Sequence, residues 1–452
     1  MRLIDRRKHR GTWLWIASTA AWWLVTAVLA RANTSEETTN TLYAFALAWT
    51  YAAALAVAIG RSTDRRIAVF RSLALTAGIL FVAAALEGAA IAGAVDYRGI
   101  RDAVRGVEGP DVDFIDDPLL LYRRRPNTRW EGRPRTDMAS YFNLPFRSER
   151  PIVFTTNDQG FRNPTPLTQA DIVLIGDSYV EGWGVSDDET ASARLRQLTG
   201  RPVGNLGTAG YGSEQELRVL ERYGLPLKPR LVAWFFFEGN DLDDDQNFDN
   251  AMLADPTESS ARRAEPWPHR WRATVDRSLT WNLFEQLRLL TDRLAPNRIN
   301  TYGWFRDQFG ATQQVYFYDF YATRTIADFE RQRLRATEAA LTRAAEVCRR
   351  NGVAFTLYYV PIKFRVYGAL CTFPAQSPCR TWQPWDLEQE VRAMCARTGI
   401  GYVSLTDAMR RAAESGALLY APTDSHWNAD GQAFVAEQVA AAWRRLGELA
   451  GP

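Results

Sequence analysis

Residues able to carry out acyl chemistry occur in separate parts of this sequence. Ser178 lies in Gly176-Asp177-Ser178, directly after the apolar run 171–175. A serine hydroxyl is a weak nucleophile alone, so it needs a base, a group that orients the base, and donors for a developing oxyanion. The base has few candidates, because the chain contains only three histidines, His9, His269 and His426.

The best candidate for the base is His426, near the carboxyl terminus. It follows Asp424 in Thr423-Asp424-Ser425-His426-Trp427. We expect His426 to accept the proton of Ser178, and Asp424 to hold the imidazole in the required tautomer. The alternatives are that Ser178 only caps a helix and that His426 is structural. His269 lies among prolines and tryptophans, and His9 lies in a basic flank, so neither is expected to act as the base.

Two further motifs could supply the oxyanion donors. A glycine-rich loop, 204–212, contains Gly210, and the stretch 237–241 contains Asn240. Glycine lets a backbone N–H approach a substrate closely, and an asparagine amide is a second donor. Together with the N–H of Ser178, these groups would surround an oxyanion.

The elements that must position these residues alternate between strand and helix. This alternation indicates a parallel sheet with crossover helices, whose loops meet at the carboxyl edge of the strands. The run 231–237 is apolar throughout, as expected for a strand covered on both faces. Asn428 or Asp430 is placed to cap the last helix. The expected strands are 171–175, 202–206, 231–237, 354–360 and 400–405, and the expected helices 214–223, 328–350, 386–397 and 431–446.

The amino-terminal part, 1–95, is expected to be a membrane anchor. Three apolar runs, 12–30, 42–60 and 72–95, have about the 17–25 residues that a transmembrane helix needs. The flanks at 1–10 and 61–66 are basic, whereas the loop 33–41 has two glutamates and no lysine or arginine. The positive-inside rule therefore places the amino terminus in the cytoplasm and everything after Val95 outside, in the periplasm or the extracellular space. A cleaved signal peptide is the rival interpretation of the first run.

Three features of the anchor and the outer part stay open. Glu87 in the third run is either functional or close to the outer interface of a tilted helix. The segment 96–165 reads as a lead-in to the sheet, with strands at 119–127 and 151–155 and a turn at 157–160. Its arginines either hold an anionic glycan or lipid headgroup or form a solvated surface. The insertion 242–327 contains Trp267, Trp271, Trp281 and Trp304 and could shape a pocket, rest on the membrane or form a local core.

Composition excludes several functions. The net charge of the 452 residues is +2, which does not indicate a nucleic-acid partner. The four cysteines form no metal pattern, but Cys371 and Cys379 flank a turn-rich loop that could be bridged outside the cytoplasm. The acidic run 241–245 lacks the spacing of a calcium loop and is expected to be solvated and to start a helix. No metal and no cofactor is expected.

These motifs, in this order, resemble those of the SGNH (or GDSL) hydrolases. Gly176-Asp177-Ser178, the loop with Gly210, Gly239-Asn240-Asp241 and the late Asp/His pair match the four blocks of that family. The resemblance implies a flavodoxin-like three-layer α/β/α fold for 166–452, with Ser178, Gly210 and Asn240 as the oxyanion hole. The commonest family pattern has its acid at the position of Thr423. The Asp-x-His-Trp form found here, and the stretch 360–363 before it, look more like periplasmic proteins that acetylate exopolysaccharides.

The sequence therefore predicts a membrane-anchored serine esterase of SGNH type outside the cytoplasm. It would remove or transfer O-acyl groups, in our interpretation acetyl groups, on cell-envelope or exported glycans. A transferase would need a membrane acyltransferase as partner to deliver the acyl group. The alternatives are a lipase or lysophospholipase acting on membrane lipids, and a non-catalytic protein that binds or assembles glycans.

Overall fold

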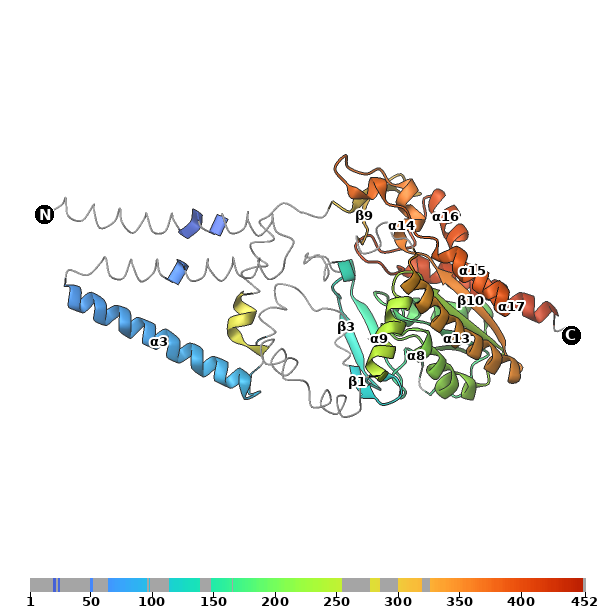
Figure 1. The fold of residues 1–452 in the computed structure, drawn as a ribbon, viewed down its shortest axis with the longest axis horizontal. Coiled ribbons are helices and arrows are strands. Elements are labelled where there is room, and N and C mark those ends of the chain that lie inside the picture. The colour runs from blue at the N-terminus through green and yellow to red at the C-terminus, as the bar shows by residue number, and fades with distance from the viewer. Residues whose placement is uncertain are drawn as a thin grey trace. The chain divides into compact units, whose positions relative to one another are not determined.

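The structure is a computed structural model. It describes residues 19–21, 23–24, 49–51, 64–95, 97, 114–138, 148–164, 166–253, 277–284, 300–318 and 326–449. The chain forms two compact units (Figure 1). The first comprises Met1–Gly106 and Arg262–Arg298, and the second comprises Val107–Ala261 and Ile299–Pro452.

The main described element of the first unit is helix α3, Arg65–Ile91. Asp64 caps it by accepting a hydrogen bond from the Arg66 N–H at 2.8 Å. Glu87, on the same helix, accepts a hydrogen bond from the backbone N–H of Thr280 at 2.6 Å. The carboxylate thus ties α3 to the segment 277–284, a role that the sequence did not indicate.

Of the three predicted membrane spans, only 72–95 falls on described residues, where α3 covers most of it. The runs 12–30 and 42–60 lie almost wholly outside the described residues. Within the described part of the chain, no helix combines the length and the apolar character needed to cross a membrane.

The second unit is built on a five-stranded sheet with every neighbouring pair parallel. Numbered along the chain, the spatial order is 2-1-3-4-5, which is the flavodoxin-like arrangement. The prediction of a parallel α/β sheet is thereby confirmed. In the order β11-β10-β7-β5-β6, the strands are Gly401–Ser404, Ala354–Val360, Leu231–Phe237, Ile172–Ile175 and Val203–Asn205.

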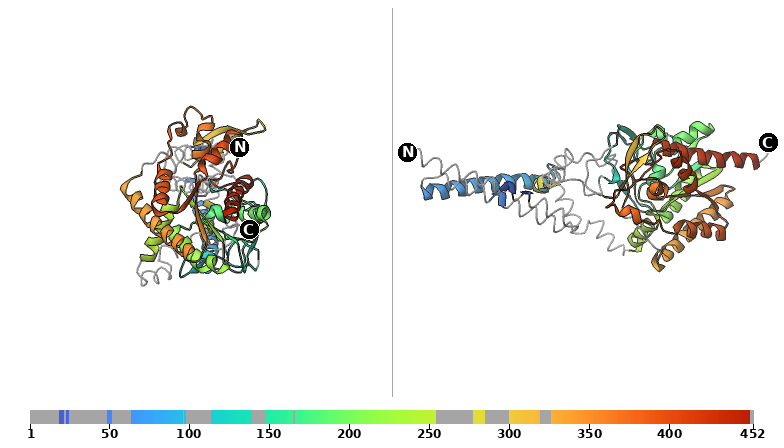
Figure 2. Two further views of the ribbon diagram at one scale, coloured as in Figure 1. Left: turned by 90° about the vertical axis from the view of Figure 1, so that its right-hand side faces the viewer. Right: turned by 90° about the horizontal axis from the view of Figure 1, so that it is seen from above.

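Helices cover both faces of this sheet and make three layers (Figures 1 and 2). Along β7, Ala233, Phe235 and Phe237 join one core, whereas Trp234 and Phe236 join the other. Each fully buried side chain of this kind contributes about 1.5–3 kcal/mol of hydrophobic free energy. One face packs against α7 (Ala191–Thr199), α16 (Thr406–Glu414) and α17 (Ala429–Leu449), and the other against α8 (Ser213–Val219), α13 (Asp328–Arg350) and α15 (Leu387–Thr398).

The predicted lead-in segment forms two antiparallel strand pairs of the second unit. These are β1 with β2 (Phe114–Asp117, Leu121–Arg124) and β3 with β4 (Arg129–Gly132, Ile152–Thr155). The predicted turn is present, since the Asn157 side chain accepts hydrogen bonds from the N–H groups of Gln159 and Phe161. Two of the arginines expected at a solvated surface, Arg124 and Arg135, are instead buried.

The predicted insertion 242–327 is not one independent segment. Its first part is helix α9, Asp241–Leu253, which packs on α8 and α13. Its last part is a hairpin of β8 (Tyr302–Arg306) and β9 (Thr312–Tyr316), whose Phe305 and Val315 belong to the core of the second unit. Of the four tryptophans, Trp281 and Trp304 are described, and Trp267 and Trp271 lie outside the described residues.

The predicted bridge between Cys371 and Cys379 is absent, and all four cysteines are free thiols. Cys379 is buried and Cys371 is partly buried. Burial raises the pKa of the Cys371 thiol to about 12, which disfavours the thiolate that disulfide formation requires.

Candidate active site

The predicted nucleophile and oxyanion donors lie at the carboxyl ends of three adjacent strands. Ser178 begins the short helix α6, Ser178–Glu181, just after β5. Gly210 lies in the loop after β6, and Asn240 follows β7. Because β6, β5 and β7 are neighbours and parallel, their carboxyl ends share one edge of the sheet.

Local hydrogen bonds make the sharp turn from β5 into α6. Asp177 caps the helix by accepting a hydrogen bond from the Tyr179 N–H at 2.9 Å. A Cβ atom on Gly176 would lie 2.6 Å from a Val180 methyl carbon, so only glycine fits there. At the end of α6, Glu181 makes a buried two-bond ion pair with Arg124 of β2, at 2.8 and 3.0 Å. The helix that carries Ser178 is therefore fixed at both ends.

Ser178 and His426 lie within hydrogen-bonding distance although 248 residues separate them in the chain. The distance from Ser178 Oγ to His426 Nε2 is 2.7 Å, and that from His426 Nδ1 to Asp424 Oδ1 is 2.6 Å. With the imidazole proton on Nδ1, the ring donates to Asp424 and accepts from the serine hydroxyl. This is the hydrogen-bond chain of a serine, histidine and aspartate triad.

The loop that carries the imidazole, residues 421–428, is called the His426 loop below. Tyr179 of α6 donates a hydrogen bond from its hydroxyl to the Ser425 carbonyl at 2.7 Å, and its ring lies 4.9 Å from that of His426. Asn428 caps α17, because its side-chain oxygen accepts from the Gly431 N–H at 2.9 Å. Of the two predicted caps, the structure therefore selects Asn428 and not Asp430.

The protonation of His426 is set by the carboxylates around it. Burial alone would lower its pKa, but Asp424, Asp137 and Asp177 outweigh burial and raise the pKa to about 9. The pKa of Asp424 moves the other way. Burial tends to raise it, and the hydrogen bonds and positive charge of His426 lower it below its usual value. Asp424 therefore stays ionised opposite the imidazole.

The residue that the sequence did not reveal is Asp137. Its side chain accepts hydrogen bonds from the backbone N–H of Ser425 at 3.0 Å and from the Ser425 hydroxyl. Its own backbone N–H donates to Asp424 Oδ2 at 2.9 Å. Its Oδ2 is 3.6 Å from His426 Nδ1. No spacing or motif singles out Asp137 in the lead-in segment.

A buried lysine supports the same loop. Lys363 begins α14, Lys363–Tyr367, and is 3% exposed. Its ammonium donates to the carbonyl oxygens of Ala421, Pro422 and Asp424 at 3.0, 3.1 and 2.7 Å. Burial lowers its pKa to about 8, against the opposing effect of Asp137 and Asp424. The stretch 360–363, noted in the sequence for its resemblance, is where this residue could have been found.

The two predicted oxyanion donors besides Ser178 are restrained by polar neighbours. Gly210 adopts a φ of +77°, and the Tyr122 hydroxyl donates to its carbonyl oxygen at 2.8 Å. The Asn240 side-chain amide donates to Asp244 at 2.7 Å. An amide nitrogen carries two N–H groups, so one donor of Asn240 is left for a substrate.

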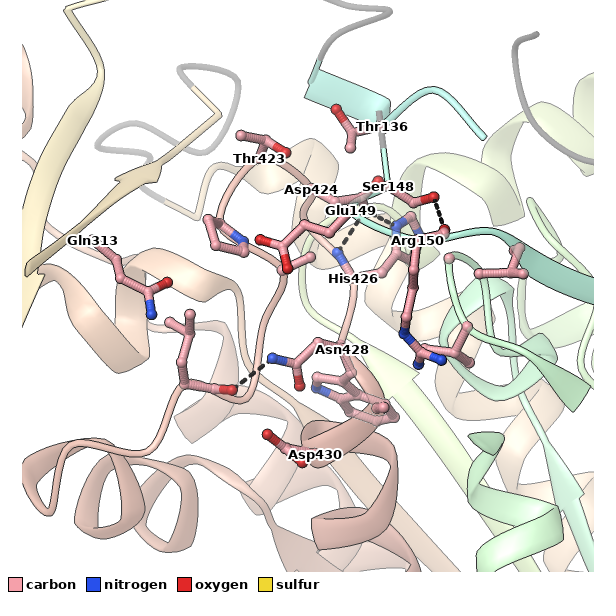
Figure 3. Close-up of a pocket in the computed structure, with 18 of the residues that line it drawn as sticks. Thr136, Ser148, Glu149, Arg150, Gln313, Thr423, Asp424, His426, Asn428 and Asp430 are labelled. Atoms are coloured by element: carbon pink, nitrogen blue, oxygen red, sulfur yellow. Dashed lines mark hydrogen bonds and ion pairs between the residues drawn. The ribbon is translucent and has the colours of Figure 1, made fainter. Parts of the chain in front are cut away.

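Beside His426 lies a pocket with a volume of about 660 Å³, within the range of small-molecule sites (Figure 3). Most of its labelled residues are polar. The aromatic side chains of Trp183 and Phe309 also line it, and Phe309 lies at the tip of the β8–β9 hairpin and is 85% exposed. The labelled residues are Thr136, Ser148, Glu149, Arg150, Gln313, Thr423, Asp424, His426, Asn428 and Asp430.

Two acidic groups could be considered as metal sites. Asp137, Asp424 and His426 place potential ligand atoms within 4.8 Å of one another. These atoms already form hydrogen bonds with one another and with Ser425, and the Lys363 ammonium bonded to the Asp424 carbonyl opposes a second cation. The arrangement therefore favours the triad.

The acidic run 241–245 begins helix α9 as predicted, but it is not solvated throughout. Asp241 and Asp245 are 1% and 4% exposed. Asp245 is held by the Thr337 hydroxyl at 2.6 Å, and Asp244 accepts from Asn240. These acids belong to the packing beneath the site, and the prediction of a solvated loop was wrong for them.

The fold and the hydrogen-bonded set of Ser178, His426 and Asp424 define a serine-hydrolase-like α/β domain. A family model described as the SGNH hydrolase-like domain of the acetyltransferase AlgX matches residues 318–451. This match includes Asp424, His426 and Lys363, and it does not reach Ser178. It supports the SGNH resemblance for the carboxyl-terminal part of the chain.

Solved structures with some similarity come from three bacteria. A putative lipolytic protein of the G-D-S-L family from Desulfitobacterium hafniense is 12% identical, with 60% of this chain and 97% of that chain covered and a TM-score of 0.31. A lipase/acylhydrolase from Enterococcus faecalis is 14% identical, with coverages of 60% and 95% and a TM-score of 0.30. An acetylxylan esterase from Geobacillus stearothermophilus is 13% identical, with coverages of 60% and 92% and a TM-score of 0.29. The comparison with curated proteins finds no match.

Proposed function

We propose that this protein is a serine esterase of SGNH type that removes or transfers O-acetyl groups on cell-envelope or exported glycans. The observation that carries the proposal is the continuous hydrogen-bond chain from Ser178 Oγ through His426 to Asp424. A serine that only capped a helix would not need an imidazole at 2.7 Å, itself held by a carboxylate.

In the proposed reaction, Ser178 Oγ attacks the acyl carbonyl while its proton passes to His426 Nε2. The negative charge that develops on the carbonyl oxygen is stabilised by the N–H groups of Ser178 and Gly210 and by the Asn240 amide. The tetrahedral intermediate expels the sugar oxygen, which takes the proton from His426 and leaves as a hydroxyl group. Water or another sugar hydroxyl then attacks the acyl-enzyme, again deprotonated by His426.

The acetyl group and the glycan are the finer part of the proposal. The pocket beside His426 combines hydroxyl, amide and carboxylate groups with the aromatic faces of Trp183 and Phe309, a lining that suits a sugar. The family model that matches 318–451 is named for an acetyltransferase. If transfer is the physiological direction, a membrane acyltransferase would deliver the acetyl group.

We also propose that the second unit works outside the cytoplasm and that the amino-terminal segment anchors it in the membrane. The support is the alternation of basic and acidic loops between three apolar runs of the sequence. A reporter fused after residue 106 tests the location. A reporter active only in the cytoplasm would contradict it.

The enzyme is tested with short aryl acetates. Ser178→Ala and His426→Ala should each lower kcat by on the order of 10⁴-fold or more, because neither group acts without the other. Ser415→Ala is the matched control, since Ser415 is exposed at the end of α16 and does not line the pocket. Equal cleavage by the Ser178→Ala protein would refute the proposal.

The same assay separates the other candidate functions. Cleavage of long-chain esters with little action on acetyl esters would indicate a lipase. Adding an oligosaccharide as acceptor shows whether transfer competes with hydrolysis, through acetylated sugar in the product.

A further inference from the structure

We propose that Asp137 is a second carboxylate of the His426 site, a positioning residue that orients the imidazole through Ser425 and favours its protonated form. This inference rests on the proposed function, because it assigns a role in the same proton transfer. It concerns a residue outside every motif that the sequence matched.

The geometry of Asp137 is that of a clamp on the two residues before the imidazole. Its backbone N–H holds Asp424 Oδ2 at 2.9 Å, and its carboxylate holds the Ser425 N–H at 3.0 Å and the Ser425 hydroxyl. These bonds join residues up to 288 positions apart and fix the loop from which His426 projects. A rotation of Asp424 would break the bond from Asp137.

Asp137 also contributes a charge. Its Oδ2 lies 3.6 Å from His426 Nδ1, whose hydrogen-bond partner is Asp424 Oδ1 at 2.6 Å. Two carboxylates therefore face one imidazole nitrogen. In a buried site, each carboxylate within about 4–6 Å favours the imidazolium over the neutral ring by about 1–3 pKa units.

The other charged groups around His426 do not cancel this effect. Asp177 on the β5–α6 turn adds to it, and Lys363 on α14 opposes it. Arg150 lines the pocket but is paired with Glu189. Burial and the nearby Asp424 raise the pKa of Asp137 itself to about 7, so its charge is fully present above that pH.

The consequence is a base stronger than an ordinary histidine. His426 holds its proton more firmly, so it accepts the serine proton more readily once neutral, but it becomes neutral only at higher pH. Removing the charge of Asp137 while keeping its shape should therefore move the acid limb of kcat/KM to lower pH.

The test is the pH profile of kcat/KM for an aryl acetate with Asp137→Asn in the full-length protein. The side-chain oxygen of asparagine can still accept from Ser425, but the negative charge is gone. We expect the acid limb to fall by about 1 unit or more and kcat/KM at high pH to decrease. Asp137→Glu, which restores the charge, should return the limb toward its original position.

The matched control is Asp158→Asn, which removes an exposed carboxylate from the same lead-in segment and should leave the profile unchanged. Asp137→Ser is a second neutral variant in case Asp137→Asn does not fold. A drop in kcat/KM by the same factor at every pH, with the limb unmoved in both neutral variants, would overturn the inference. Activity that does not depend on Ser178 would overturn the proposed function instead.

Discussion

At the scale of single residues, the site depends on backbone positions that only glycine can occupy. Gly210 has a φ of +77°, a region that costs other residues about 1–2 kcal/mol. A Cβ atom there would also lie 2.7 Å from the Tyr122 hydroxyl, which holds the carbonyl of Gly210. The proposed oxyanion donor thus combines backbone strain with a close contact.

We expect Gly210→Ala to lower both stability and activity. The new methyl group pushes against Tyr122, so the N–H of residue 210 moves from the oxyanion, and kcat for aryl acetates should fall by up to about 10²-fold. Gly352→Ala is the matched control, because Gly352 also has a positive φ, at +70°, but nothing within 4 Å. It should lose about 1 kcal/mol of stability by thermal unfolding and keep its kcat. Equal kcat values for both variants would contradict the assigned role.

The sequence indicated Ser178 and His426 through their types and local context, and the structure brings them together. It could not indicate Asp137, because the bond to Ser425 joins positions 288 residues apart and no local pattern marks the acid. Lys363 was visible only through the resemblance of the stretch around it. Its function, which is to hold three carbonyl groups, depends on the loop and not on any spacing.

At the scale of elements, the β8–β9 hairpin borders the pocket. Its core-facing residues Phe305 and Val315 are buried, whereas Phe309 at the tip is 85% exposed. A large aromatic side chain at a pocket rim can stack on the apolar face of a sugar, an interaction of about 0.5–1.5 kcal/mol if it resembles an aromatic pair. The hairpin would then select the glycan without taking part in the chemistry.

Phe309→Ala should therefore lower kcat/KM for an acetylated oligosaccharide by about 3- to 10-fold. Cleavage of a small aryl acetate, which does not reach the hairpin tip, should be unchanged. Leu198→Ala is the control, since it removes an exposed apolar side chain from α7, away from the pocket. An equal loss on both substrates would show that the hairpin supports the fold and not the glycan.

Elements with a clear period were predictable, and those fixed by distant contacts were not. The apolar run 231–237 matches β7 residue for residue, because a strand buried on both faces has no polar positions. The acidic start of α9 contains charges that normally face solvent, so burial of Asp241 and Asp245 against α8 and α13 could not be anticipated. The disulfide prediction was wrong because sequence proximity does not show whether two thiols meet in bonding geometry.

At the scale of the whole second unit, buried acids should make stability depend on pH. Burial raises the pKa of Asp245 to about 6, of Asp177 to about 6 and of Asp244 to about 7, from a usual value of 3.8. An acid whose pKa is higher in the folded state binds its proton more tightly there. Its stabilising effect is full below about pH 4 and is lost as the pH rises through the folded pKa.

The free energy of unfolding should therefore decline between about pH 4 and pH 7 through these groups. Asp245→Asn should flatten the decline by up to about 3 kcal/mol, because each pKa unit corresponds to about 1.4 kcal/mol. Thr337 and the Glu214 N–H can still donate to the asparagine oxygen. Chemical unfolding at pH 5 and pH 7.5 measures the difference, with Asp158→Asn as an exposed control. An unchanged slope in Asp245→Asn would contradict the assignment.

The distance in sequence between Ser178 and His426 has a consequence for biosynthesis. A ribosome releases the serine long before the imidazole, and the two meet only after the last crossover helix has docked. The emerging polypeptide thus carries an inert hydroxyl through translation and any translocation. Competence arrives in one late step, so esters met along the way are left untouched.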